Sequence, residues 1–599
     1  MQSSPVENSF FGRLGHTATK WPNKGIAMTP KVSLAGCLAL ALALFSMGAT
    51  AQDMVFTTSD VGDVAAPPPP PSGPPSEALA NALRLYQQEH YAQAAVQFQR
   101  IVQGETGDQP ANVQKAQFFL GKCFYHLGFF QAALGVFEEI AMMSTGHLYF
   151  QTTLQWLAQL SRELPEPAGI IGLVGRYGDS VSVLQEFNKK ETKDLYNELL
   201  YLMGRHWYQM GEFAKARDFF LEINRNHELY VSAVFFTGIT YVRERKAAPA
   251  SKAFLSIVDK YEDILFLSDE EERFLNLAWL SLARIYYSTK HWDSAIEAWN
   301  RIPQSSEYYL DALFEESWAF FQVDQYDRAL GNIHTINSPY FEQDFYPESL
   351  VLKAVIYFDR CLYDDAQTTV GEFTTKYEPI NAELQAALAQ FQDNQQFFEF
   401  LKTLRKYFEE QGSMEGFSAS VSVGTGGVQG AAGAAQPSTT SLGFSPEILS
   451  VIRGALDDRT LLRNLEYVEV LDSEEGKLKK MPPMFVNSAA GIRIQQDINT
   501  ARAVAVDNTG NLARSRYERL LAEIQDLLNQ TTRVEIEILK ALRGELDIEI
   551  QTESELTGPA VQEAKIESDA EHVIWPFEGE FWRDELGYYR QPVTSRCGR

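Results

Sequence analysis

The stretch that decides the fold is WLSLARIYYSTKHWDSAIEAWNRI, residues 279–302. In its first half, Trp279, Leu282 and Tyr286 are three and four residues apart and therefore share one face of a helix. After the polar pair at 289–290 the same spacing returns, at Trp292, Ala295, Trp299 and Ile302. The stretch predicts two amphipathic helices joined by a tight turn. Such a hairpin cannot bury its apolar stripe alone, so we expect neighbours of the same kind.

The same pattern occurs elsewhere in the chain. An aromatic or turn residue is followed after three positions by alanine and after four more by a large apolar residue. The matches are Tyr91-Ala94-Phe98, Phe130-Ala133-Phe137, Phe213-Ala216-Phe220, Ala247-Ala250-Phe254, Trp292-Ala295-Trp299, Tyr326-Ala329-Ile333 and Tyr363-Ala366-Val370. Successive alanines are 39, 83, 34, 45, 34 and 37 residues apart. The gap of 83 leaves room for one degenerate repeat, which we place at 154–177.

The pattern W-x2-L-A-x2-Y…A-x3-W, with its steps of 34 residues, resembles the tetratricopeptide repeat. About eight repeats near residues 76–380 carry the resemblance. The departures are uneven spacing, the poor third repeat and the general lack of a closing proline. The resemblance implies an all-α fold, a superhelical solenoid of helix pairs, followed here by a helical and partly coiled-coil C-terminal region.

We expect five parts along the chain. Composition and pattern divide it into residues 1–51, an extension and signal peptide; 52–75, a proline-rich linker; 76–411, the solenoid with capping helices; 412–443, a Gly/Ala/Ser-rich linker; and 444–599, the helical C-terminal region with an aromatic tail. In the 45-residue step, Ser268 and Glu271 form the S-x-x-E pattern of a capping box and predict a helix start.

Residues 28–52 have the layout of a secretory signal, with translation expected to start at Met28. Lys31 precedes an apolar core at 34–45, and Ala49-Thr50-Ala51 is a cleavage site. The alternative is the lipoprotein-like Leu34-Ala35-Gly36-Cys37, with Cys37 lipidated. Because the apolar core follows Cys37, we favour cleavage after Ala51. We therefore expect export across the inner membrane to the periplasm or outer membrane, and no membrane span in the mature chain.

The three remaining cysteines, Cys123, Cys361 and Cys597, cannot all pair within the chain, and no pair has metal or redox spacing. Cys123 and Cys361 lie in apolar helical patterns, where we expect small buried side chains. For Cys597, near the end of the chain, a free thiol and an intermolecular link are both open.

The C-terminal region predicts a long helix and a docked tail. Apolar residues in steps of three and four begin at Tyr517, and their helix should pair with residues 446–471 or with a second protomer: Leu520, Ile524, Leu527, Val534, Ile538 and Leu542. The aromatic segment 573–589 should occupy a hydrophobic groove of this chain or of a partner. With the signal and linkers, the tail resembles tetratricopeptide envelope proteins of deltaproteobacteria, including those of the myxobacterial gliding machinery.

No catalytic constellation stands out. The motifs H-E-x-x-H, G-x-S-x-G, C-x-x-C and the dinucleotide fingerprint are missing from the sequence. A net charge of −27 with pI ≈ 4.8 argues against nucleic acid as a partner. We therefore expect no enzyme activity, no cofactor and no metal, and other proteins as partners.

The resemblance implies a binding groove. In tetratricopeptide hairpins the first helix lines the concave face, and residues beside its packing stripe point into the groove. Here those positions are Tyr201, Arg205, Tyr208, Phe235, Arg284, Tyr287, Phe314, Trp318, Phe321 and Phe358. Aromatic residues with arginine are typical of protein interfaces. Two alternatives remain open: several of these are core residues in a slightly different register, or the chain's own long helix or tail fills the groove.

These observations predict a non-catalytic scaffold or adaptor of the cell envelope. Its groove would bind peptide or helical segments of partner proteins, in a motility or envelope complex with peripheral outer-membrane association. The rival interpretations are an enzyme or enzyme subunit with a site in 444–599, and a cell-wall-binding protein, for which no recognition signature is visible.

Overall fold

The computed structural model describes residues 75–341, 344–391, 393–410, 428–429, 445, 448–449, 451–453, 458–551 and 577–597. The signal, the proline-rich linker and most of 412–443 lie outside this set. The chain divides into two compact units, Met1–Leu202 with Ser473–Ile498 and Met203–Asp472 with Asn499–Arg599, called here unit 1 and unit 2. The described residues are mainly α-helical, as predicted, and none of their helices is both long and apolar enough to cross a membrane.

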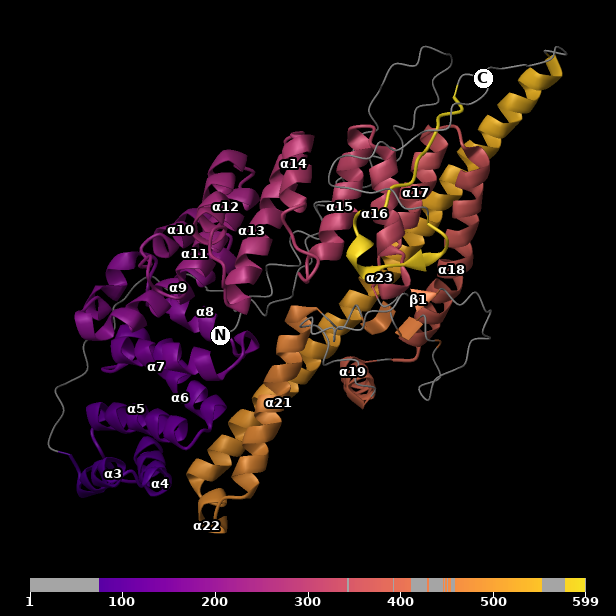
Figure 1. The fold of residues 1–599 in the computed structure, drawn as a ribbon. Coiled ribbons are helices and arrows are strands. Elements are labelled where there is room, and N and C mark those ends of the chain that lie inside the picture. Colours follow the sequence, from indigo (N-terminus) through magenta and orange to yellow (C-terminus); the bar gives the residue numbers. More distant parts are fainter. Residues whose placement is uncertain are drawn as a thin grey trace. The chain divides into compact units, whose positions relative to one another are not determined.

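Unit 1 contains the first helix pairs (Figure 1). Its helices are α3 (Glu77–Gln87), α4 (Tyr91–Val102), α5 (Pro110–His126), α6 (Phe130–Met143), α7 (Phe150–Glu163) and α8 (Ile170–Val174). Short 3-10 segments are η2 (Ser144–Gly146), η3 (Glu166–Ala168), η4 (Gly175–Tyr177), η5 (Val181–Phe187) and η6 (Lys190–Thr192). The degenerate repeat is thus a full helix followed by a second helix of only 5 residues. Helix α9 (Lys193–Gln209) begins in unit 1 and ends in unit 2.

Unit 2 continues the pairs. Its helices are α10 (Phe213–Phe220), α11 (Tyr230–Arg243), α12 (Ala247–Tyr261), α13 (Asp269–Ser288), α14 (Trp292–Trp299), α15 (Tyr309–Gln322), α16 (Tyr326–Ile336), α17 (Glu348–Asp359), α18 (Tyr363–Ala389) and α19 (Asn394–Glu410), with η7 (Pro339–Phe341). The expected capping box at Ser268 and Glu271 is present at the start of α13.

The C-terminal region adds helices to both units. They are α21 (Arg459–Lys479), α22 (Pro483–Val486) and α23 (Ala489–Gln551), followed by η8 (Arg583–Glu585) in the tail. A two-residue antiparallel pair joins β1 (Val428–Gln429) to β2 (Glu580–Phe581). Residues 473–498, which are the end of α21, all of α22 and the start of α23, belong to unit 1. The rest of α21 and α23 belongs to unit 2.

One turn geometry recurs between the helices of seven pairs. The residue five positions before each register alanine has φ between 54° and 77°: Glu89, Gly128, Gly211, Arg245, Lys290, Asp324 and Cys361. The next residue donates its N–H to the carbonyl five positions earlier, at 2.8–3.0 Å, as in His291 to Tyr286. This left-handed cap satisfies carbonyls at the end of the first helix. Its spacing reproduces the alanine register.

Small residues let the two helices of a pair approach closely. The register alanines of the second helices are buried. Ala283, in the first helix of the stretch quoted first, is buried as well. In other pairs a glycine of the first helix receives a phenylalanine of the second: a Cβ on Gly238 would lie 2.6 Å from the ring of Phe254. Gly121 and Gly204 meet Phe137 and Phe220 in the same way. The repeated spacing of small and large apolar residues in the sequence therefore marks the positions where the two helices of each pair pack together.

Candidate partner-binding face

The ten residues expected to line a groove are all at least half-buried. Arg205, Tyr208, Phe235 and Arg284 are buried. Tyr201, Tyr287, Phe314, Trp318, Phe321 and Phe358 have intermediate exposure. Their role in binding a partner stays a prediction, but the structure gives most of them neighbours within unit 2.

Arg284 joins neighbouring helix pairs. Its Nη2 lies 2.6 Å from Glu315 Oε1, and its Nε donates to both oxygens of the same carboxylate. Trp299 Nε1 also donates to Glu315, at 3.3 Å. Burial opposes the charge on Arg284, but the adjacent carboxylate more than offsets it, so the pKa of Arg284 is raised. The arginine from α13 therefore holds α15 in place.

Four other candidates from α9 to α13, namely Arg205, Tyr208, Phe235 and Tyr287, contact aromatic residues of the repeats. The guanidinium of Arg205 lies 4.6 Å from the ring centre of Phe236, which Tyr208 also contacts edge-on. The ring of Phe235 packs with that of Phe254. Tyr287 is edge-on to Trp292 and Trp299, and burial raises its pKa. These contacts favour the interpretation of several candidates as core residues.

The last two helix pairs carry a cluster to which α23 contributes. Ile538 of α23 is fully buried with residues of α15 to α18, and Val534 and Leu542 pack against the same cluster. Three of the four candidates of these pairs, Trp318, Phe321 and Phe358, pack against it too. Figure 1 shows α23 in orange beside α17 and α18. Because 534, 538 and 542 are four apart, one stripe of α23 is seated on the repeats.

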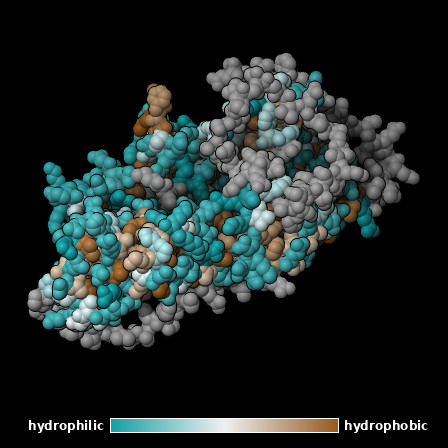
Figure 2. Space-filling model, turned by 90° about the horizontal axis from the view of Figure 1, so that it is seen from below, coloured by the Kyte–Doolittle hydropathy of each residue, from teal (hydrophilic) through white to brown (hydrophobic). Residues whose placement is uncertain are grey.

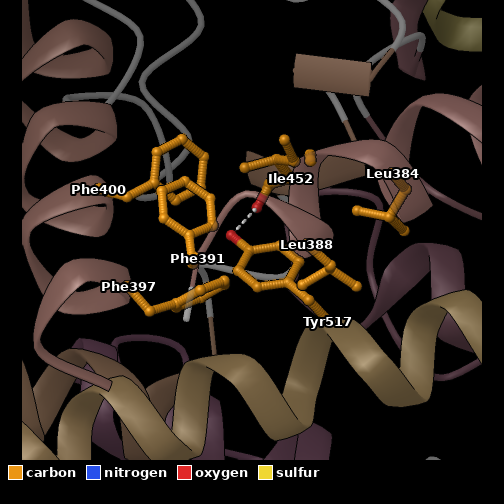
Figure 3. A pocket seen from close by; sticks show the side chains of 8 residues that line it. Leu384, Leu388, Phe391, Phe397, Phe400, Ile452 and Tyr517 are labelled. Atoms are coloured by element: carbon orange, nitrogen blue, oxygen red, sulfur yellow. Dashed lines mark hydrogen bonds between the residues drawn. The ribbon is translucent and has the colours of Figure 1, made fainter. Parts of the chain in front are cut away.

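A second contact of α23 lies nearer its middle. Tyr517 is 1% exposed and donates its hydroxyl to the carbonyl of Ile452 at 3.1 Å. Figure 3 shows its ring facing Phe397 from α19, with Leu384 of α18 nearby. The lining of this small pocket is otherwise apolar: Leu384, Ala387, Leu388, Phe391, Phe397, Phe400 and Ile452. No converging polar groups line it, so it does not support the rival enzyme interpretation.

The aromatic tail docks on unit 2. Three of its rings, Phe577, Phe581 and Tyr589, surround His334 of α16 at centroid distances of 4.7, 4.8 and 5.0 Å. Burial, with Lys353 adding to it, lowers the pKa of His334, so the imidazole is neutral among the rings at pH 7. The sequence predicts that the tail occupies a groove either of this chain or of a partner. The structure shows it in a groove of this chain.

The end of the tail is covalently fixed, which corrects the cysteine predictions. Cys597 forms a disulfide with Cys361, with Cα atoms 5.1 Å apart. Neither a free thiol nor an intermolecular link therefore describes Cys597, and Cys361 is not a small helical core residue. It is the left-handed turn residue between α17 and α18. The signal was present in the register, because 361 lies five positions before Ala366. Cys123 is buried and free, as predicted.

Unit 1 has a contact that the sequence did not reveal. Glu474 of α21 is 4% exposed and accepts hydrogen bonds from the backbone N–H groups of Phe130 and Gln131, at 3.0 and 3.2 Å. Both N–H groups belong to the first turn of α6, where the helix itself offers no carbonyl acceptor and negative charge is favoured. Arg493 of α23 adds an ion pair with Glu139 at 2.7 Å. Residues 473–498 are therefore bound to the second helix pair.

The visible surface does not present a continuous hydrophobic band. Figure 2 shows a mainly hydrophilic face with separate hydrophobic groups, one of which projects from it. Among the described residues the most exposed apolar pair is Leu265 and Phe266, at 91% and 92%, in the connection between α12 and α13. Ile264 beside them is 47% exposed. Three consecutive exposed apolar residues form a small contiguous patch, and contiguous exposed apolar surface is what marks interaction sites on proteins.

Comparisons with known proteins give only distant structural similarity. Neither a family model nor a curated protein matches the sequence. A tetratricopeptide repeat protein from Parabacteroides merdae is 14% identical, with 44% of this chain and 92% of that chain covered and a TM-score of 0.28. The apo form of RapI is 13% identical, with 56% of this chain and 92% of that chain covered and a TM-score of 0.30. NprR in complex with its cognate peptide NprX is 12% identical, with 49% of this chain and 87% of that chain covered and a TM-score of 0.22.

TM-scores this low carry no argument, so the fold is identified from the chain's own geometry. The left-handed cap at a constant distance from the register alanine and the glycine–phenylalanine contacts recur along consecutive antiparallel helix pairs. The described part of the chain is therefore an all-α repeat of helix pairs, as the sequence predicts.

Proposed function

We propose that this protein is a non-catalytic scaffold of the cell envelope, which binds helical or peptide segments of partner proteins within a larger assembly. The observation that carries the proposal is the seating of α23. The stripe of Val534, Ile538 and Leu542 packs on a cluster of the last helix pairs, so these repeats accept an amphipathic helix. A partner helix with the same spacing would satisfy the same chemistry.

We propose that a foreign partner contacts the connection 262–268. Ile264, Leu265 and Phe266 are exposed there, and the acidic residues Glu262 and Asp263 precede them. A complementary partner would offer an apolar pocket rimmed by basic side chains. The connection falls in the 45-residue step of the repeat register, which exceeds the 34-residue steps on either side, so it is an addition to the basic hairpin.

The envelope location rests on two supports. Residues 28–52 have the layout of a secretory signal. The disulfide between Cys361 and Cys597 is of a kind that persists in oxidising compartments such as the periplasm. Outer-membrane association and a role in motility are finer parts of the proposal, and lipidation of Cys37 is the alternative route to the membrane.

The test is crosslinking in cells followed by purification from envelope fractions. We would compare the wild type, the double variant Leu265→Ser/Phe266→Ser and the control Leu221→Ser, which changes a lone residue that is 66% exposed. We expect partners with the wild type and the control, and their loss with the double variant. Identical partners in all three would remove the connection from the proposal. A wild type that crosslinks to no protein would overturn the scaffold itself.

A further inference from the structure

We propose that unit 2 contains a peptide-recognition site on α15 to α17 whose ligand is an extended, aromatic segment, and that the tail 577–597 is the ligand it holds. The site adjoins the cluster that seats Ile538, because Val593 of the tail packs against that cluster. The proposal does not depend on the proposed function, because it concerns this segment and not a foreign helix.

The first argument is that repeat side chains bind the main chain of the tail. Tyr309 donates its hydroxyl to the carbonyl of Leu586 at 2.9 Å, and Gly587 N–H donates to Thr335 Oγ1 at 3.0 Å. Gln304 Nε2 donates to the carbonyl of Arg583 at 2.8 Å. Contacts to main-chain groups fix the register of an extended segment, as grooves for peptides do.

The second argument is that side chains of the tail supply the anchors. The rings of Phe577, Phe581 and Tyr589 contact His334, and Leu586 is 3% exposed. Aromatic anchors in an apolar setting dominate the affinity of many interfaces. A segment without these rings would keep the main-chain contacts and lose most of the buried apolar surface.

The third argument is steric selection at two glycines. A Cβ on Gly331 of α16 would collide with the carbonyl oxygen of Tyr589, so only glycine lets the tail lie against this helix. Gly587 in the tail has φ of 87°, which L-residues rarely adopt, and its Cβ would collide with the Tyr309 hydroxyl. Receptor and ligand therefore each carry a glycine that the complex requires.

The fourth argument is the fastening at the end of the segment. Gln591 N–H donates to the carbonyl of Asp327 at 3.0 Å, and Arg596 N–H donates to the carbonyl of Arg360 at 2.9 Å. These contacts bring Cys597 to Cys361, where the disulfide forms. The two thiols give up two protons and two electrons to a disulfide oxidant such as oxidised glutathione, which becomes two thiols. Recognition precedes the covalent bond.

The experiment uses the full chain with a protease site inserted between residues 551 and 577. The oxidised protein is cleaved, so the tail stays attached through the disulfide, and is then reduced with dithiothreitol. Retention of the tail is measured by gel filtration. Exchange is measured by fluorescence anisotropy with a labelled synthetic peptide of residues 577–597, or with the same peptide carrying Gly587→Ala. The protein variants are Gly331→Ala and the control Gly371→Ala, whose added Cβ would meet nothing within 4 Å.

We expect the reduced wild type and Gly371→Ala to retain the tail and to exchange it for the labelled peptide. Gly331→Ala should bind at least about tenfold more weakly, and the Gly587→Ala peptide should fail to compete for the wild type. On reoxidation, labelled peptide should become attached to the wild type but not to Cys361→Ser. The proposal is overturned if the reduced wild type releases its tail without binding peptide, or if both peptides compete equally. The peptide comparison decides even where Gly331→Ala fails to fold.

Discussion

At the scale of single residues, the carboxyl group of Glu474 gives unit 1 a dependence on pH. Burial raises its pKa to about 7, although the N–H groups of Gln131 and Phe130 oppose the rise. The pKa is higher than in the unfolded chain, so unfolding releases a proton between about pH 4.5 and pH 7. Stability from this group is therefore present at low pH and is lost as the pH rises through that window.

We predict that Glu474→Gln reduces this loss. Glutamine keeps an oxygen for the N–H groups of α6 but cannot ionise, so between pH 5 and pH 7.5 the variant should lose about 2 kcal/mol less stability than the wild type. Hydrogen exchange of the Phe130 and Gln131 amides at both pH values measures the effect. Some slope should remain, because burial also raises the pKa of Asp497 to about 6. Equal slopes in the two proteins would contradict the prediction.

The pair Arg284 and Glu315 permits a second prediction at this scale. Arg284→Met leaves a buried carboxylate without its partner and should cost about 3–5 kcal/mol of stability. Adding Glu315→Leu removes the stranded charge and should restore most of the loss. Urea unfolding followed by tryptophan fluorescence measures both, since Trp299 touches this carboxylate. A double variant no more stable than Arg284→Met would show that the charges are not coupled.

The sequence predicts which side chains repeat, but it does not predict their exact surroundings. Arg284 and Tyr208 fit a groove on composition, whereas the structure surrounds them with neighbouring repeats. Their burial depends on how consecutive pairs twist, which a spacing of three and four residues does not specify. The position of Cys361 in a turn could have been predicted from the register. It lies five residues before Ala366, where every other pair has its left-handed turn residue.

At the scale of elements, the 63-residue helix α23 illustrates what periodicity can predict. Its buried positions from Tyr517 to Ile538 follow the predicted steps, and Thr531, four residues after Leu527, is also buried at 1% exposed. The pattern does not name the partner surface, because an apolar stripe fits many surfaces. Residues 446–471 were a predicted partner. Tyr517 does contact Ile452, but Ile538 packs on the repeats.

We predict that Ile538→Asp detaches this part of α23 from the repeats. Ile538 is fully buried, so the variant places a carboxylate in an apolar cluster and should destabilise unit 2 by at least about 3 kcal/mol. The matched control is Leu539→Asp, one position along the same helix and 50% exposed. Hydrogen exchange of α23 amides distinguishes them: it should accelerate strongly only in Ile538→Asp. Acceleration of the same size in Leu539→Asp would show that helix propensity, not packing, is responsible.

At the scale of the whole molecule, the sequence predicts the repeat architecture and a docked tail, but not the division into two units or the cross-link. The disulfide joins residues 236 positions apart in sequence. No local pattern links positions at such a distance, so only the packed structure reveals the pair. The prediction of five parts along the chain is likewise a statement about composition, and spatial units need not follow it.

We predict that Cys597→Ser lowers the stability of unit 2 by about 2–5 kcal/mol, because the long loop is no longer closed in the unfolded chain. Urea unfolding compares the variant with the wild type, with and without dithiothreitol. The two proteins should unfold alike once reduced. A difference that persists under reduction would indicate that the serine itself, and not the lost cross-link, is responsible.

The disulfide also has a mechanical consequence. A chain pulled by its two ends carries tension through every peptide bond unless a cross-link offers a shorter route. Here the route passes from Cys361 directly to Cys597, so the segment between them, including all of α23 and the docked tail, bears no load while the bond is intact. At about 3.5 Å per residue, the shielded segment would add roughly 800 Å of contour length after reduction. Under oxidising conditions the C-terminal helices are thus protected from a force that can unravel the repeats before them.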